Sequence, residues 1–589
     1  RVHSAVEFSM KVSQEYSMSI TLETGVGTVY YYTRIIQRST KETVSDYLTF
    51  AKDYSETSVD KENAGGLYNY LEPEESYADV NFNRVNIHSE WDTITWGEMH
   101  PTITQHGVPT LKEINETTGS ITMEYQIAAL DENGKQELYE VTDFYRLRDT
   151  ELGVALLEFN REMQQVFDGT LNVISSEGLL LGIRDRNVHY MMNEASTIVA
   201  FVQQGDLWTY TPETDRFVRV FTFRKDRNSE LRDSRTEHDM KIIRVSEQGD
   251  VDFALYGYMN RGIHEGYSGI SVCHYDSEQN VVEEKVFIPS TQSFEFLKEN
   301  MGILSYVNES NQLFLLFAGK LYQVDVDGRT YQILDQGIDS ESFHASDTNA
   351  HAAWLTENSR GVRQLKEIDF DTGKIRLIDP GANQLVQVLG FFNEDVIYGV
   401  ALEENTMLDI RGNEVIGMSL IRIEDFNGNV KKSYDPGYLM INAKISSTIM
   451  EMELVQKEGS GYKVIRTENI MNSKKVAGSS VNFELTYDNR RSVMILMAFT
   501  NEIGSEAPFA IYAKNRLSEK VEIPLDTSVP EQDLFYVYGG GRMVGTFASP
   551  AEAVIAAEET MGVVLNRNQQ YIWERGNRRS SISLTLAHC

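Results

Sequence analysis

The sequence predicts a mainly β chain: a seven- or eight-bladed β-propeller followed by a small C-terminal α/β domain with the order ββαββ. Short antiparallel hairpins return about every 40–50 residues, a period typical of propeller blades. Tyr (30) and Phe (26) are abundant while Pro (11) is scarce, which favours strands over disordered linkers. After Leu525 the hairpin pattern ends, and a glycine triplet and a Ser-Pro helix start appear instead.

The clearest hairpin is Leu321–Leu334. Leu321 and Tyr322 begin two alternating series that fall on opposite sides of an extended strand, and the return strand starts at Tyr331. Asp327-Gly328 lies where the chain must reverse, and glycine tolerates the positive φ that tight hairpin turns require. We therefore expect an antiparallel hairpin here, with Gly328 in the left-handed region.

Eight hairpins match this pattern, and their equivalent positions are Phe159, Tyr210, Tyr275, Val324, Ile368, Ile423, Arg466 and Tyr512. Eight matches indicate eight blades. Seven blades and an extra N-terminal sheet fit equally well, because the segment Arg224–Glu237 reads as an insertion and Arg466 matches poorly. We expect an N-terminal strand such as Val26–Arg34 to complete the last blade, since closure removes exposed sheet edges.

The predicted domains are N-terminal strands with an insertion in residues 1–120, propeller blades in 121–525, a small α/β domain in 530–577 and a tail in 578–589. Within the first 150 residues, Lys41–Asp53 has helical spacing and Trp91–Trp96 has strand character. Ser120–Ala129 and Glu137–Arg146 should pair across a turn that contains Asn133-Gly134.

In the C-terminal domain, the strands Leu534–Tyr538 and Met543–Phe547 should precede a helix at Ala551–Thr560. Ser549 is placed to cap that helix and Pro550 fits its first turn. Two further strands follow the helix.

The charge of −34 argues against a nucleic-acid partner, because phosphate binding needs clustered Lys and Arg. No run of about 18 apolar residues marks a membrane span. Because the first residue is Arg1 rather than Met, we expect that a signal or anchor segment has been removed, so membrane contact would come only through that segment. Two cysteines, Cys273 and Cys589, cannot form a disulfide framework, and Cys273 lies in an apolar strand pattern.

The tail at residues 537–577, which begins VYGGGRMVGTF, resembles a segment that follows β-propellers in large Gram-positive surface proteins. In that family a papain-like peptidase domain often comes next. The helix positions Ala551, Ala553 and Ala556 with Gly562 also resemble peptidoglycan-binding modules of the sporulation-related repeat type. The resemblance implies an extracellular or cell-surface location. No peptidase motif precedes the end of the chain, so no catalytic residue is carried over, and Cys589 has no downstream His to activate it.

The most concentrated metal-ligand types are Glu98, His100 and His106, which lie close together in a loop-like region. Without a fourth ligand they remain weak candidates, and no metal or other cofactor is predicted. Cys273 and His274 should point to opposite faces of a strand and not converge on one ion with His264. Asp325-Val326-Asp327-Gly328 resembles a calcium loop but lacks its spacing, so it is interpreted as a turn.

Aromatic residues near the predicted blade loops could stack on sugars or peptide side chains: Trp91, Trp96, Tyr258, Tyr267 and Trp354. The leading hypothesis is a non-catalytic extracytoplasmic propeller that binds a protein partner or a cell-wall polysaccharide. The alternatives are a propeller glycosidase or lyase, whose carboxylates come from distant blades and leave no local motif, and the accessory part of a larger surface peptidase.

Overall fold

The computed structural model of the chain describes residues between 9 and 574. Residues outside the description are 1–8, 13, 25–26, 37–41, 76–81, 83, 115–116, 131–133, 172, 176, 183–187, 225–231, 234, 291, 293, 309, 359–360, 409–413, 447–448, 460, 473–480, 487–493, 501–508, 517–520, 526–533, 567–569 and 575–589. The predicted tail 578–589, with Cys589, therefore lies outside the described residues. None of the described helices has the length and apolar character needed to cross a bilayer.

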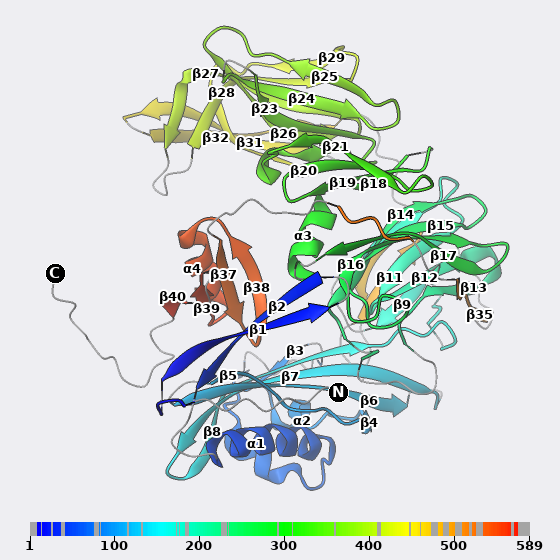
Figure 1. Cartoon of the computed structure of the whole chain (residues 1–589), viewed down its shortest axis with the longest axis vertical. Helices are drawn as coiled ribbons and strands as arrows, with labels where there is room; N and C mark the ends of the chain where they lie inside the picture. The colour runs from blue at the N-terminus through cyan, green and yellow to red at the C-terminus, as the bar shows by residue number, and fades with distance from the viewer. Residues whose placement is uncertain are drawn as a thin grey trace.

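The first layer is an N-terminal sheet that lies at the bottom of Figure 1 with helices α1 and α2 below it. Its strand order is β3-β8-β7-β6-β4, and β5 also pairs with β6. The elements are α1 (Glu42–Val59), α2 (Trp91–Ile94), β3 (Arg84–Asn86), β4 (Thr102–Gln105), β5 (Thr110–Ile114), β6 (Thr118–Leu130), β7 (Gln136–Thr150) and β8 (Gly153–Gln165). Tyr47, Ala51 and Tyr54 repeat at helical spacing and are buried against this sheet.

A buried ion pair lies inside this N-terminal core. Arg161 on β8 donates from Nε to Oδ1 of Asp143 on β7 at 2.8 Å, and both side chains are fully buried. Tyr125 and Tyr145 also donate to Oδ2 of Asp143. The Arg161 guanidinium lies 4.1 Å from the ring centroid of Trp96. The buried charges are thus satisfied by hydrogen bonds as well as by each other.

Four antiparallel meanders of four strands follow along the chain, each joined in the order in which its strands occur. They are β10 (Tyr190–Met192), β11 (Val199–Gln203), β12 (Asp206–Thr211) and β13 (Arg216–Phe221); β14 (His238–Val245), β15 (Val251–Tyr258), β16 (Ser268–Asp276) and β17 (Val281–Ser290); β18 (Ser305–Val307), β19 (Gln312–Phe317), β20 (Lys320–Asp325) and β21 (Thr330–Gln336); and β22 (His344–Ala345), β23 (His351–Glu357), β24 (Arg363–Asp369) and β25 (Lys374–Ile378). Such a meander is the repeating unit of β-propellers.

A larger sheet continues the series at the top of Figure 1. It follows the path β26-β27-β28-β30-β31-β32, with β29 paired to β28. Its strands are β26 (Gln384–Phe392), β27 (Asp395–Leu408), β28 (Glu414–Glu424), β29 (Val430–Tyr434), β30 (Leu439–Ile445), β31 (Ile449–Glu458) and β32 (Gly461–Met471).

Neighbouring sheets in this series pack face to face through apolar clusters. Val220 of β13 and Phe253 of β15 belong to the cluster between the first two meanders. Phe314 of β19 and Trp354 of β23 belong to the cluster between the third and fourth. Alternating strand residues supply these faces, so each sheet is stabilised by burial against the next.

The described sheets form an open series. At its start, β9 (Gly178–Gly182) pairs with β34 (Met494–Phe499), which also pairs with β33 (Val481–Thr486). That small sheet packs on the β10–β13 meander through Leu179 and Phe201. Among the described residues, no apolar cluster joins β30–β32 to β33, and the sheets do not close into a ring.

Three local predictions are wrong. Phe159, the first of the eight equivalent positions, does not lie in a blade hairpin, because β8 runs unbroken to Gln165 as part of the N-terminal sheet. Val26–Arg34 does not complete a blade, since β2 (Gly27–Ile36) pairs with β1 (Glu15–Thr24) in a separate hairpin. Trp91–Trp96 contains helix α2 and not a strand.

The hairpin at Leu321–Leu334 is confirmed as β20 and β21, in antiparallel register with Val324 opposite Tyr331. The expected conformation of Gly328 is wrong, because the positive φ of this turn falls on Arg329 (53°). A Cβ at Gly328 would lie 2.6 Å from a carboxylate oxygen of Asp325, so the Asp325 side chain would have to shift to admit one. That carboxylate accepts a hydrogen bond from the Gly328 amide at 2.8 Å.

A small C-terminal sheet has the strand order β38-β37-β39-β40 and carries helix α4. The elements are β37 (Phe535–Gly539), β38 (Arg542–Phe547), α4 (Pro550–Glu559), β39 (Val563–Leu565) and β40 (Tyr571–Glu574). Pro550 occupies the first turn of α4, but Ser549 forms no side-chain capping hydrogen bond. The hairpin β37–β38 lies against the N-terminal sheet, where Gly541 closely approaches Thr122.

Candidate functional site

The outer edges of the first two meanders are covered by the chain's own C-terminal segment. Strand β35 (Phe509–Tyr512) adds in parallel to β13, and β36 (Lys514–Arg516) adds in parallel to β17. The Ala513 amide donates to the Arg219 carbonyl at 3.0 Å, and the Lys514 amide donates to the Asn280 carbonyl at 3.0 Å. One extended segment therefore crosses the edges of two neighbouring sheets.

This segment corrects another prediction. The sequence pattern places Tyr512 in a blade hairpin, as the last of the eight equivalent positions. In the structure the segment around Tyr512 pairs with two different sheets, and Val521 lies beside Phe287 of β17, whose amide donates to the Val521 carbonyl at 2.9 Å. Alternating apolar residues identify an extended strand but not the edge with which it pairs.

The next two outer strands, β21 and β25, are the last strands of their sheets, and no described strand lies on their outer side. Most side chains of β21 are exposed on both faces, whereas β25 is exposed mainly through Lys374, Ile375 and Leu377. Four of these side chains are large and apolar: Tyr331 (37% exposed), Ile333 (38%), Ile375 (51%) and Leu377 (53%). A sheet edge with unpaired backbone groups and apolar side chains is a template for binding another strand.

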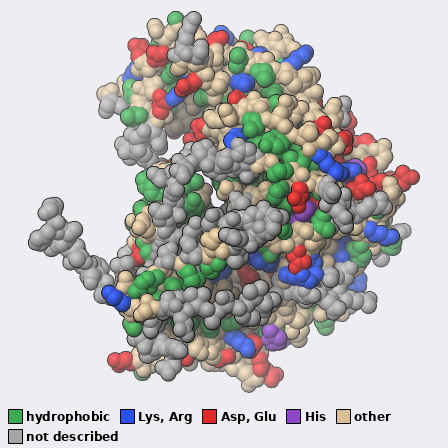
Figure 2. Space-filling view, viewed as in Figure 1, with side chains coloured by type: hydrophobic (Ala, Val, Ile, Leu, Met, Phe, Trp, Pro, Cys, Tyr) green, Lys and Arg blue, Asp and Glu red, His purple; other side chains and the backbone are tan. Residues whose placement is uncertain are grey.

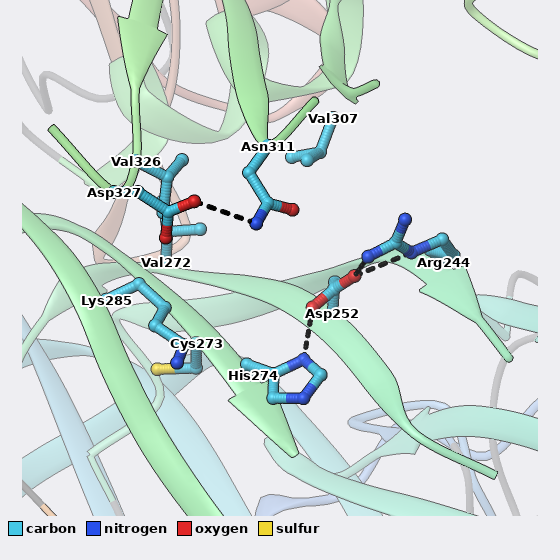
Figure 3. Close-up of a pocket in the computed structure, with 10 residues that line it drawn as sticks. All are labelled: Arg244, Asp252, Val272, Cys273, His274, Lys285, Val307, Asn311, Val326 and Asp327. Carbon is cyan, nitrogen blue, oxygen red and sulfur yellow. Dashed lines mark hydrogen bonds and ion pairs between the residues drawn. The ribbon is translucent and has the colours of Figure 1, made fainter. Parts of the chain in front are cut away.

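A second feature is a small cavity of about 160 Å³ between the β14–β17 and β18–β21 meanders. Figure 3 shows its lining, in which Arg244, Asp252 and His274 form a connected polar chain. His274 Nδ1 lies 2.6 Å from Oδ1 of Asp252, and Nε of Arg244 donates to Oδ2 of Asp252 at 2.7 Å. On the opposite wall Asn311 donates to Asp327 at 3.0 Å.

The hydrogen bond with Asp252 raises the pKa of His274 above its ordinary value. Burial opposes ionisation of Asp252, but the bonds from His274 and Arg244 hold the pKa of this carboxyl below its usual range. The cavity can therefore present imidazolium and guanidinium donors to a small anionic or carbonyl group. Both cations are already paired with Asp252, which weakens their attraction for an added anion.

A nearby buried cluster has nucleophile-like residues in an order unsuited to nucleophilic catalysis. Ser271 donates to Oε1 of Glu284, and His264 Nε2 lies 3.0 Å from Oε2 of the same carboxylate. The carboxylate thus lies between the hydroxyl and the imidazole, whereas a triad places the imidazole next to the nucleophile. Burial raises the pKa of Cys273 to about 12, so its thiol stays protonated and unreactive.

Two carboxylates also converge between the β22–β25 meander and β28. Arg376 Nε lies 2.9 Å from Glu367 Oε2, and its Nη2 donates to Glu424 Oε2 at 3.2 Å. The Glu367 side chain is fully buried, and burial raises its pKa to about 7. Neither of its carboxylate oxygens receives a well-oriented hydrogen bond from the described residues. A buried acid without solvent access cannot reach a sugar substrate in this conformation.

The predicted aromatic residues do not form one surface. Trp96 and Trp354 are buried in the cores of different parts of the chain, and Trp354 donates from Nε1 to Asp335 at 2.9 Å. Trp91 is partly buried and donates to the Ala64 carbonyl at 3.1 Å. These three side chains contact protein groups, as expected of packing aromatics.

Tyr258 and Tyr267 flank the loop between β15 and β16. The guanidinium of Arg235 lies 4.2 Å from the ring centroid of Tyr258, while Tyr267 is 42% exposed. Tyr258 and Tyr267 come close together at this end of the sheet, because Gly257 and Gly269 pair across the adjoining strands. Ligand binding by the five aromatic residues stays a prediction.

The weak metal candidates make separate contacts in the structure. His106 Nδ1 lies 3.1 Å from a carboxylate oxygen of Glu56, and His100 Nε2 lies 3.7 Å from one of Glu98. Within the described part of the chain, no three His, Cys, Asp or Glu side chains are grouped to hold a metal ion. As expected from strand geometry, Cys273 faces Ser271 whereas His274 faces Asp252.

No protein-family model matches the chain, and no curated protein matches its sequence. Solved structures with some likeness include BamB from Moraxella catarrhalis (8% identity, 60% of this chain and 97% of that chain, TM-score 0.20). TolB from Acinetobacter baumannii is another, with 12% identity over 45% of this chain and 80% of that chain and a TM-score of 0.18. A third is the β-propeller domain of the Trilobed protease from Pyrococcus furiosus, with 12% identity over 56% of this chain and 100% of that chain and a TM-score of 0.22.

Proposed function

We propose that this protein is a non-catalytic binding scaffold with a propeller-like series of sheets, in which the outer sheet edges recognise a protein partner. The observation that carries this proposal is the difference between neighbouring edges. β13 and β17 are covered by added strands, whereas β21 and β25 are terminal strands with exposed apolar side chains. Exposed apolar groups on an uncovered edge favour protein binding over solvation.

Protein is favoured over cell-wall polysaccharide as the partner. Sugars bind through exposed aromatic faces together with convergent polar groups, but two of the three tryptophan candidates are buried. The exposed side chains of β21 and β25 include the aliphatic residues Ile333, Ile375 and Leu377, which are suited to pack against apolar side chains of a protein. The resemblance of the tail to surface proteins supports an extracytoplasmic location.

In this proposal residues 121–525 include the binding unit, while the domain at 530–577 connects it to the N-terminal sheet. Support comes from the hairpin β37–β38, in which Arg542 Nη1 lies 3.6 Å from a carboxylate oxygen of Glu162 on β8.

Acidic and basic side chains are interspersed over the face shown in Figure 2, so no single-sign patch dominates there. Partner choice should therefore depend on apolar contact as well as on charge.

The experiment compares wild-type protein with the variant Tyr331→Lys/Ile333→Lys/Leu377→Lys. Both are immobilised and exposed to a cell-envelope protein extract and, separately, to purified peptidoglycan fragments. The proposal expects one or more proteins to be retained by wild type and lost from the variant. Leu152→Lys, at a fully exposed position in the β7–β8 turn, is the matched control and should retain them. Equal retention by all three proteins, or binding of peptidoglycan fragments alone, would contradict the proposal.

A further inference from the structure

The chain itself shows what kind of segment fits an outer sheet edge. Residues 509–516, FAIYAKNR, lie along two edges in succession. Phe509–Tyr512 runs parallel to Arg216–Arg219 of β13, Ala513 makes the connection, and Lys514–Arg516 runs parallel to Val281–Glu283 of β17. Eight residues are therefore enough to cross from one sheet to its neighbour.

The same edge geometry returns at β21 and β25. Each is the fourth strand of an antiparallel meander, as β13 and β17 are, and their two sheets are neighbours that pack through Phe314 and Trp354. In FAIYAKNR, four residues pair with β13 and three pair with β17. β21 has seven residues and β25 has five, so each is long enough to pair with a segment of that length.

We propose that β21 and β25 together bind an extended segment of a partner protein as an added parallel strand, with apolar side chains at alternate positions along β21 as in FAIYAKNR. This inference rests on the proposed function and specifies how the partner binds. The main-chain hydrogen bonds of the added strand supply affinity, and contacts with Tyr331, Ile333, Ile375 and Leu377 supply selectivity.

The probe is a fluorescently labelled synthetic peptide FAIYAKNR, titrated into the full chain and followed by fluorescence anisotropy. The tethered copy of this sequence already occupies β13 and β17 at a high effective concentration, so the free peptide binds only at uncovered edges. We expect saturable binding, and a loss of at least tenfold in affinity when alternate amides of the peptide are N-methylated. N-methylation removes the strand's donors without changing its side chains.

Protein variants locate the bound peptide. Ile333→Lys and Leu377→Lys should each weaken peptide binding at least fivefold, while Leu152→Lys should leave it unchanged. All three positions are exposed, so each variant should fold, and circular dichroism checks that it does. Absence of saturable binding, or binding that is insensitive to both N-methylation and Ile333→Lys, would overturn strand addition. If envelope proteins are still lost from the triple Lys variant in that case, the scaffold function stands and only the binding mode fails.

Discussion

Arg219 on β13 lies directly beside Tyr512 on β35 in parallel register, with its guanidinium 4.2 Å from the tyrosine ring centroid. The Arg219 carbonyl also accepts a hydrogen bond from the Ala513 amide at 3.0 Å. This pair therefore fixes the C-terminal segment on the first sheet edge at the point where the segment crosses to the second.

Tyr512→Ala should loosen this segment without unfolding the sheets. Loss of an exposed cation–π contact costs about 0.5–1 kcal/mol, which corresponds to a roughly two- to fivefold change in the local opening equilibrium. Amide hydrogen exchange of residues 509–516 should accelerate by that factor, and Tyr512→Phe should exchange as wild type does. Unchanged exchange in Tyr512→Ala would show that the main-chain bonds alone hold the segment.

Asp143→Asn should be strongly destabilising, because it leaves the fully buried Arg161 without its charge partner. We expect a loss of about 3–5 kcal/mol in the free energy of unfolding, measured from the denaturant transition that follows the tryptophans of the N-terminal core. Asp252→Asn breaks a pair with the partly exposed Arg244 and should cost about 1 kcal/mol or less. Similar losses for the two variants would contradict the role assigned to burial.

Glu367 should make stability fall as the pH rises. Burial raises its folded-state pKa to about 7, above the value near 4.5 of an exposed Glu. The folded state therefore holds a proton that the unfolded state has released between about pH 4.5 and 7, so stability is greatest below this window and decreases through it.

Between about pH 4.5 and 7, the free energy of unfolding of wild type should fall by roughly 3 kcal/mol relative to that of Glu367→Gln. Chemical denaturation at a series of pH values measures this difference. The matched control is Glu414→Gln, because Glu414 forms a partly exposed pair with Arg363. Its stability curve should run parallel to that of wild type. A constant difference between wild type and Glu367→Gln across the window would exclude protonation of Glu367.

The pKa of His274 should lie above that of an ordinary histidine, because Asp252 stabilises the protonated form of His274. The stabilisation is fully present below the unfolded-state pKa and is lost as the pH rises through the folded-state pKa. Asp252→Asn should shift the titration of His274 to lower pH in NMR spectra. The same substitution should leave the titration of His351 unchanged, since His351 pairs with Glu394 at 2.8 Å.

Local sequence patterns predicted the hairpins well where turn chemistry and alternation agreed. Gly373 and Gly428 lie in turns with φ of 68° and 83°, as the Asp-Thr-Gly and Asn-Gly sequences indicate. Pairing of Ser120–Ala129 with Glu137–Arg146 is confirmed within β6 and β7. In each case the signal lies within a few residues of the turn.

Long-range pairing could not be predicted in this way. The alternation of a strand carries no information about its partner, so the pattern assigns Phe159 and Tyr512 to blade hairpins although both pair elsewhere. Candidate ligand-binding aromatics were equally ambiguous, because the same residue types fill cores, as Trp96 and Trp354 do. Among the described strands none pairs with the outer side of β21 or β25, and no local sequence pattern distinguishes these edges from the covered edges of β13 and β17.

Hydrogen exchange of β21 tests the central claim most directly. In the free chain, amides within Thr330–Gln336 should include a fast-exchanging set, while those of β13 are protected by β35 on the outer side. Saturating FAIYAKNR peptide should slow the fast set of β21 at least tenfold in wild type and not in Ile333→Lys. Unchanged exchange of β21 at a peptide concentration that saturates the anisotropy signal would show that this edge does not accept a strand.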